Sequence, residues 1–217
     1  MDTSSNIFVS LFFIHGALGT AILAWWFLTK KQQTLKDFGW GMAGYAAGLA
    51  IWSFVVLTKP TDLKPLILLG VIPFLLASVA YAKAASAKLP AKSSTLMTVT
   101  FILLAATFLA RTFFYPSEPY FSDKGLLFFG LQSVPVALYI ATISVSFLPA
   151  IRAVTAEIKD KATKSLMGVC LTILYVNSII FVSAKDDTLL LINGVVLSVA
   201  LLVLWTKALG SLSSPKA

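Results

Sequence analysis

The stretch from residue 38 to residue 58 reads FGWGMAGYAAGLAIWSFVVLT and holds no acidic or basic residue. A helix needs about 20 predominantly apolar residues to cross a bilayer, so this stretch predicts a membrane-spanning helix. Gly41, Gly44 and Gly48 recur along it at helical spacing. Small residues let helix backbones approach closely in lipid. We therefore expect this helix to be a tightly packed, central member of a bundle.

The rest of the chain repeats this apolar pattern. Of its 217 residues, 58% are hydrophobic and only 12% are charged, whereas soluble domains are about 25% charged. We predict an all-α fold in which residues 1–217 form a single domain, a bundle of seven transmembrane helices. The predicted spans are Ile7–Thr29, Phe38–Thr58, Pro65–Ala82, Ser94–Ala110, Gly125–Pro149, Ser165–Ser183 and Thr188–Trp205.

Basic residues predict how the bundle is oriented. Cytoplasmic loops carry an excess of Lys and Arg, and here twelve of the seventeen basic residues fall in three alternate loops and the C-terminal tail. We therefore expect the N-terminus outside and the C-terminus in the cytoplasm, which requires an odd number of spans. The twelve are Lys30, Lys31, Lys36, Lys83, Lys88, Lys92, Arg152, Lys159, Lys161, Lys164, Lys207 and Lys216.

The middles of the predicted spans lack acidic and basic residues, which disfavours a proton-coupled transporter. The last span has no lysine for a retinal Schiff base, which argues against a rhodopsin. His15 is the only histidine and Cys170 the only cysteine, so we expect no metal site, cofactor or catalytic constellation, and no enzymatic activity. No nucleic-acid-binding element is visible.

Five side chains with polar groups are predicted to lie at a common depth in the outer half of the bilayer. They are His15, Trp52, Gln132, Asn177 and Asn193. Counted from the outer end of each span at about 1.5 Å per residue, all lie roughly 8–12 Å deep. Such groups face the bundle interior because lipid offers them no partner. We predict that they line a ligand pocket; the alternative is that they only cross-link helices.

Two further features bear on this pocket. The longest external loop, from Arg111 to Lys124, carries five aromatic residues that either cap the pocket or rest on lipid headgroups. Pro73 and Pro135 fall inside predicted spans, where a proline kinks a helix.

The segment from Pro119 to Gly130 reads PYFSDKGLLFFG and resembles the external approach to the fifth helix in the seven-helix membrane sensor domains N-terminal to bacterial histidine kinases. The stretch from Phe38 to Phe54, with its small residues and Trp52, is similar to their second helix. The resemblance implies seven spans with the N-terminus outside, and a sensory role. Those domains continue into an output domain, whereas this chain stops shortly after its last span.

These features favour a sensor or receptor-like module in a bacterial plasma membrane that binds a small ligand from the outer side. The expected partners are the lipid bilayer and either another membrane protein or a cytoplasmic output protein. Two alternatives stay open from the sequence: a small-solute transporter or permease, and an accessory subunit of a larger membrane complex.

Overall fold

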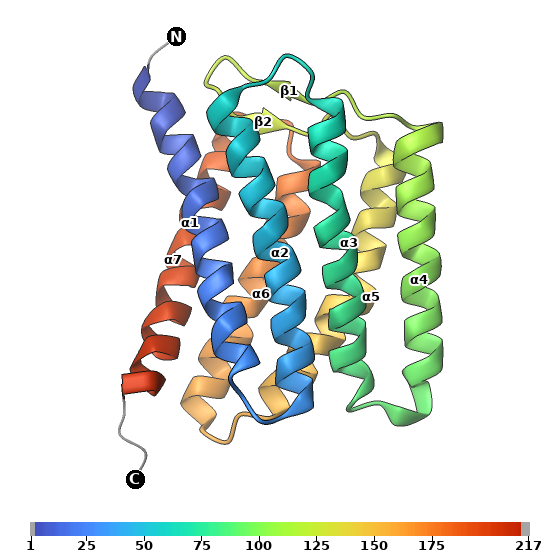
Figure 1. The fold of residues 1–217 in the computed structure, drawn as a ribbon, viewed down its shortest axis with the longest axis vertical. Coiled ribbons are helices and arrows are strands. Elements are labelled where there is room, and N and C mark those ends of the chain that lie inside the picture. The colour runs from blue at the N-terminus through green and yellow to red at the C-terminus, as the bar shows by residue number, and fades with distance from the viewer. Residues whose placement is uncertain (1–2, 214–217) are drawn as a thin grey trace.

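The computed structural model describes residues 3–213, with side chains described from residue 12 to residue 207. In this part of the chain, seven α-helices run up and down along a common axis (Figure 1). A 3-10 turn, Pro90–Lys92, precedes α4, and a π-helical turn, Ala110–Phe114, continues it. The helices are α1 Thr3–Leu28, α2 Gln33–Thr58, α3 Lys64–Ser86, α4 Ser93–Leu109, α5 Ser133–Ala156, α6 Lys161–Ser183 and α7 Asp187–Ser213.

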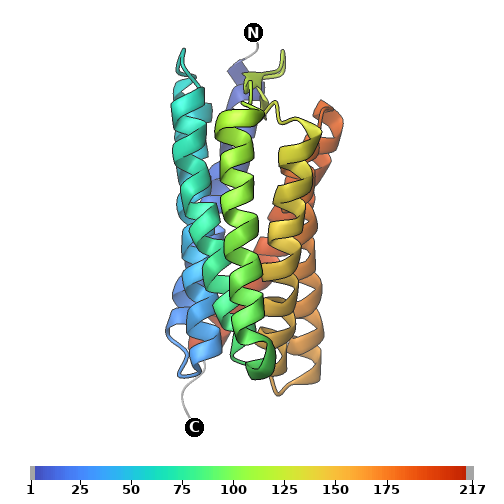
Figure 2. The ribbon, with the colours of Figure 1, turned by 90° about the vertical axis from the view of Figure 1, so that its right-hand side faces the viewer.

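The helices form two rows. Helices α1 to α3 lie in one row and α5 to α7 in the other, and α4 closes one side of the bundle between α3 and α5 (Figures 1 and 2). Each helix packs against its neighbours in the chain, and further contacts join α1 to α7 and α3 to α5. Two short antiparallel strands, β1 Tyr120–Phe121 and β2 Leu127–Phe128, form a hairpin over one end of the bundle.

Most of these helices are suited to a bilayer. Within the residues whose side chains are described, six helices are long and apolar enough to cross a membrane, and α1 contributes the apolar stretch Phe12–Leu28. The chain is therefore a helical, multi-pass membrane protein. The six are Gln33–Thr58, Lys64–Ser86, Pro90–Phe114, Ser133–Ala156, Lys161–Ser183 and Asp187–Lys207.

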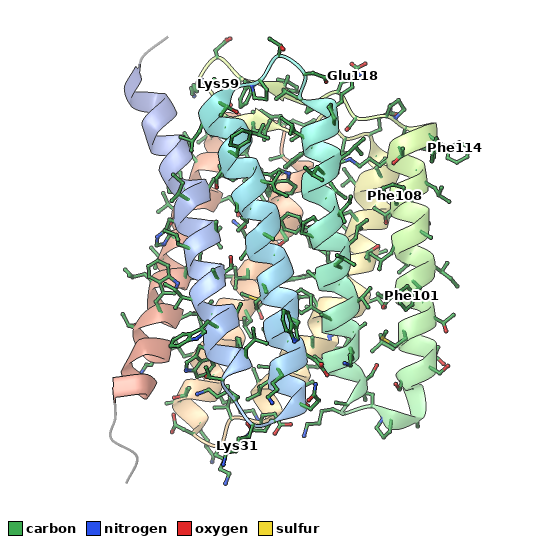
Figure 3. All side chains as sticks on the ribbon, viewed as in Figure 1. Lys31, Lys59, Phe101, Phe108, Phe114 and Glu118 are labelled. Atoms are coloured by element: carbon green, nitrogen blue, oxygen red, sulfur yellow. The ribbon has the colours of Figure 1, made fainter. Side chains whose placement is uncertain are left out.

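Helix α4 is the most peripheral of these six. In the span Pro90–Phe114, which α4 forms with its two flanking turns, only 22% of the residues in the most apolar stretch are buried inside the bundle. The corresponding share for α2 is 50%. Its exposed positions include Phe101, Ile102 and Phe114, and the side chain of Phe114 points away from the bundle in Figure 3. This face is the kind of surface that acyl chains cover, whereas α2 lies among protein neighbours.

Aromatic rings that pack directly against glycines join α2 to α3. A methyl group added to Gly41 would come within 2.3 Å of the Tyr81 ring, and one added to Gly48 within 2.1 Å of the Phe74 ring. The reverse pair also occurs, since the Trp52 indole of α2 lies over Gly70 of α3. The expectation that the glycines of α2 mark a close-packed helix is confirmed.

The fifth predicted span was wrong at its start. Helix α5 begins at Ser133 rather than at Gly125, and the apolar segment before it belongs to the hairpin. Gly125 and Gly130 both have positive φ, at 78° and 56°, which breaks any helix there. Pro135 therefore lies in the first turn of α5, where proline is tolerated, and not at a kink.

Charged side chains gather at the two ends of the bundle. Lys31 marks one end, and Lys59 and Glu118 mark the other (Figure 3). At the Lys31 end, Lys83 pairs with the buried carboxylate of Asp37 at 3.2 Å, which links α3 to α2. The hydrogen bond from Gln33 Nε2 to Asp37 at 2.9 Å completes that site. The buried charge of Asp37 at this end is therefore paired.

The glycine contacts predict how sensitive α2 is to a single methyl group. A Cβ at Gly44 would lie 2.8 Å from the backbone oxygen of Pro73, which cannot rotate away. We expect Gly44→Ala to lower the free energy of unfolding by about 1–3 kcal/mol, as overpacking does. Gly168→Ala is the control, because the added methyl meets only Thr155 at 3.7 Å. Thermal unfolding in maltoside micelles measures both, and equal stability of the two variants would contradict the close-packing assignment.

Candidate functional site

The hairpin between α4 and α5 inserts a buried segment into one end of the bundle. All four residues of Leu126–Phe129 are 5% exposed or less. The strands pair through Tyr120 with Phe128 and Phe121 with Leu127. Non-helical backbone is stable at membrane depth only where protein buries it. The segment therefore forms a cap that belongs to the interior. The aromatic residues of the loop before it do not share this burial, since Phe113, Phe114 and Tyr120 are exposed.

Gly130 fixes the end of this cap. Its φ of 56° suits glycine, and a Cβ would lie only 2.0 Å from the carbonyl oxygen of Glu118. The Glu118 amide in turn donates a hydrogen bond to the Gly130 carbonyl at 3.5 Å. The two arms of the loop therefore meet backbone against backbone, with no space for a side chain between them.

Arg111 is the unexpected residue of the interior. It lies in the π-helical turn that ends α4, and only 8% of it is exposed. Its Nε and Nη2 atoms are buried with no hydrogen-bond partner in the protein. Among the described residues, no carboxylate forms an ion pair with it within 4 Å. Its guanidinium carbon lies 6.0 Å from the centre of the Phe129 ring, within range of a cation–π contact.

Trp52 also lies close to Phe129. Its indole stacks on Phe74, with ring centres 4.4 Å apart, and lies 4.5 Å from Phe129. Only 3% of Trp52 is exposed, and its indole N–H has no hydrogen-bond partner. Phe129 of the cap is thus close to both a buried tryptophan and a buried arginine.

A small cavity separates these side chains, and we call it the Arg111 cavity. Its walls include Trp52, Val71, Phe129 and Tyr139, with Arg111 as the charged group. It offers about 20 Å³ to the centre of a water molecule, and one water needs about 10–15 Å³ of such space. The cavity therefore admits only a few atoms unless a wall moves.

A second cavity of about 20 Å³ continues toward the middle of the bundle. Phe74 and Tyr139 line both cavities, so the two adjoin. A hydrogen bond between the hydroxyls of Tyr45 and Ser178, at 2.9 Å, crosses from α2 to α6 beside it. The interior beneath the cap is thus a chain of small spaces with aromatic walls.

The predicted polar layer does not form as one pocket, although two of its members meet. The side-chain amide of Asn177 on α6 donates to the backbone carbonyl of Asn193 on α7 at 3.2 Å. The side-chain amide of Asn193 donates in return to the backbone carbonyl of Asn177 at 3.3 Å. This reciprocal bond cross-links α6 and α7. Both asparagines also border a third cavity of about 50 Å³, bounded by Leu126 and Leu127 of the cap.

His15 lies elsewhere, at the contact of α1 with α7. Its Nε2 is 3.3 Å from the Ser198 carbonyl oxygen, and its ring lies 4.8 Å from the Trp205 ring. These contacts give the imidazole a structural partner on the neighbouring helix. His15 and the asparagine pair therefore belong to different helix contacts.

The placement of Gln132 inside the fifth span was wrong. Gln132 is the residue that precedes α5, and its side chain is exposed. Its assigned depth rested on a helix beginning at Gly125, and the hairpin removes that helical stretch. Gln132 therefore lies at the surface and not in the polar layer.

A sequence signal for Arg111 existed in the periodicity of α4. The buried positions Thr100, Leu104 and Thr107 are followed by Arg111 at the same helical spacing, so Arg111 continues the inward face. The predicted span ended at Ala110, which placed Arg111 in the external loop and hid its position on the inward face. Thr107 borders the same cavity and bonds to the Thr142 hydroxyl at 3.1 Å, which ties α4 to α5.

No protein-family model matches this chain, and no curated protein or solved structure matches it either. Among the described residues, no group of three or more His, Cys, Asp or Glu side chains is placed to hold a metal ion. The site is therefore characterised by its own geometry: a capped, aromatic cavity with one buried guanidinium.

The backbone contact at Gly130 predicts how the cap responds to substitution. We expect Gly130→Ala to loosen the hairpin, because the added methyl meets the Glu118 carbonyl at 2.0 Å and the φ is left-handed. Limited proteolysis of the loop between Tyr115 and Gly125 should become faster than in the unmodified protein. Gly168→Ala should leave the rate unchanged. Equal protection of the loop in both variants would show that the cap does not depend on this contact.

Proposed function

We propose that this chain is a membrane receptor-like sensor that binds a small ligand in the Arg111 cavity and acts through a partner protein. One observation carries the proposal: Arg111 is 8% exposed, and two of its guanidinium nitrogens have no partner beside a capped cavity. An unpaired buried charge lowers stability by several kcal/mol. A ligand that pairs with it recovers that free energy, which couples binding to the packing of the cap.

Our proposal includes seven spans, with the N-terminus outside and the C-terminus in the cytoplasm of a bacterial cell. The loops of the bundle alternate between its ends, and the N- and C-terminal ends lie at opposite ends (Figure 1). The C-terminal end is the one that gathers most basic residues, as cytoplasmic loops do. The cap then faces outward, which suits a ligand from outside. The resemblance to kinase-linked sensor domains agrees with this role.

A small-solute transporter is the second candidate, and one observation favours it. The Arg111 cavity and the second cavity share Phe74 and Tyr139, so they lie in succession along the bundle interior. A solute that passed these two side chains would move from the capped end toward the middle. A receptor needs only the first space, whereas a transporter needs a route through both.

Filling the cavity tests the site. We expect a small-molecule library, screened by thermal unfolding in maltoside micelles, to contain compounds that stabilise the protein. Val71→Phe should abolish their effect, because Val71 is a cavity wall. Val169→Phe is the matched control, since Val169 is 56% exposed on α6. A hit that stabilises both variants alike, or no hit at all, would argue against a ligand site here.

Reconstitution separates the two candidates. In proteoliposomes, a receptor should bind the stabilising compound saturably without carrying it across the bilayer. Flux of that compound that exceeds protein-free vesicles, and that Val71→Phe removes, would favour the transporter instead.

The orientation is tested by labelling single cysteines in intact cells. In a Cys170→Ala background, we expect Glu118→Cys to react with a membrane-impermeant maleimide from outside. Lys31→Cys should react only after the cells are opened, because it lies at the opposite end of the bundle (Figure 3). Labelling of Lys31→Cys in intact cells would reverse the proposed orientation.

A further inference from the structure

We propose that the ligand of the Arg111 cavity is a small monocarboxylate, held by the Nε and Nη2 edge of the guanidinium. This inference rests on the proposed function, since it names the chemistry of the same site. Three features of the site support it: two nitrogens of Arg111 lack partners, no described carboxylate pairs with Arg111, and the cavity walls are mostly apolar.

The unpartnered atoms of Arg111 are a matched pair. Nε and Nη2 point their N–H groups in the same direction along one edge of the planar guanidinium. Both are buried without a hydrogen-bond partner in the protein. Two parallel N–H donors fit the two oxygens of a carboxylate in a bidentate bond, which is among the strongest polar contacts in proteins. The free edge therefore selects a planar, two-oxygen acceptor.

The charge of the site favours a monoanion. Guanidinium carries one positive charge and has no acceptor. The described ion pairs all involve lysines elsewhere in the bundle, so no protein carboxylate already neutralises Arg111 within 4 Å. One carboxylate would balance the charge, whereas a doubly charged phosphate would leave one buried charge uncompensated. A neutral ligand would leave the guanidinium charge uncompensated as well.

The walls favour a short apolar tail. Val71, Phe74, Phe129 and Val182 present hydrocarbon to the cavity, and an alkyl chain loses no hydrogen bonds when it contacts them. The space of about 20 Å³ holds about one water molecule, so a carboxylate with a short tail fits only if a wall moves. The unpaired edge is closed off by packing, so a ligand must displace a wall. Phe129 is the wall carried by the hairpin, and its movement would transmit binding to the cap.

The stability of the protein without added ligand is the first measurement. We expect Arg111→Gln to raise the unfolding temperature in phosphate-free maltoside micelles, by ~2–4 °C for each kcal/mol recovered. Arg152→Gln is the matched control, because Arg152 is the other arginine of the chain and is exposed at the end of α5. A lower unfolding temperature for Arg111→Gln alone would mean that Arg111 is structural, and would overturn the proposal.

Binding is the second measurement, with formate, acetate, propionate and butyrate as probes. We expect these carboxylates to raise the unfolding temperature of the unmodified protein and of Arg152→Gln. Arg111→Gln should weaken binding at least tenfold, as loss of a charged hydrogen bond does. Arg111→Lys keeps the charge but lacks the two-donor edge, so it should also bind more weakly than the unmodified protein. Propionamide has the shape of propionate without its charge, and it should give no shift.

The controls distinguish the failures. If propionamide equals propionate, or Arg111→Gln keeps full affinity, the carboxylate assignment is wrong. It is also wrong if chloride alone stabilises through Arg111, or if anionic lipid displaces propionate. In those cases a library compound whose effect Val71→Phe removes would leave the proposed receptor function standing. If no carboxylate and no library compound binds, both proposals fail together.

Discussion

Aromatic rings that pack directly against glycines hold α2 against α3, and the packing of the bundle interior depends on that contact. Tyr81 covers Gly41, Phe74 covers Gly48, and Trp52 covers Gly70. In lipid, apolar burial does not drive helices together, so close van der Waals packing must do so. The same rings also form cavity walls. Phe74 lines both the Arg111 cavity and the second cavity, and Trp52 lines the Arg111 cavity. Helix association and cavity shape therefore have one cause.

The sequence predicted the helical bundle well because lipid imposes a simple rule: each span must be long, apolar and internally hydrogen-bonded. The same rule explains the main error. The segment from Leu126 to Phe129 is as apolar as a span and adjoins α5 directly, so hydropathy alone merges the two. Only Gly125, Gly130 and Pro135 signal the break, and their positive φ or first-turn position is a local backbone property that hydropathy does not measure.

The candidate site was less predictable, because the depth of a residue in the bilayer does not show which way its side chain points. His15, Trp52, Asn177 and Asn193 lie on four different helices, and a common depth cannot say which of them face each other. The structure pairs the asparagines with each other and places His15 against α7. Periodicity carries the missing information, since the inward face of α4 runs from Thr100 through Thr107 to Arg111.

Comparison with the other buried charge shows why Arg111 stands apart. Asp37 is also buried, but it has Lys83 and Gln33 as partners within 3.2 Å, so it needs nothing further. Arg111 has the same burial without such partners, under a cap that non-helical backbone holds in place. Folding alone does not favour this arrangement, because a buried charge without a partner lowers stability. Natural proteins retain destabilising groups where function requires them. The unpaired edge of Arg111 is therefore the observation on which our proposal of a ligand from outside the chain rests.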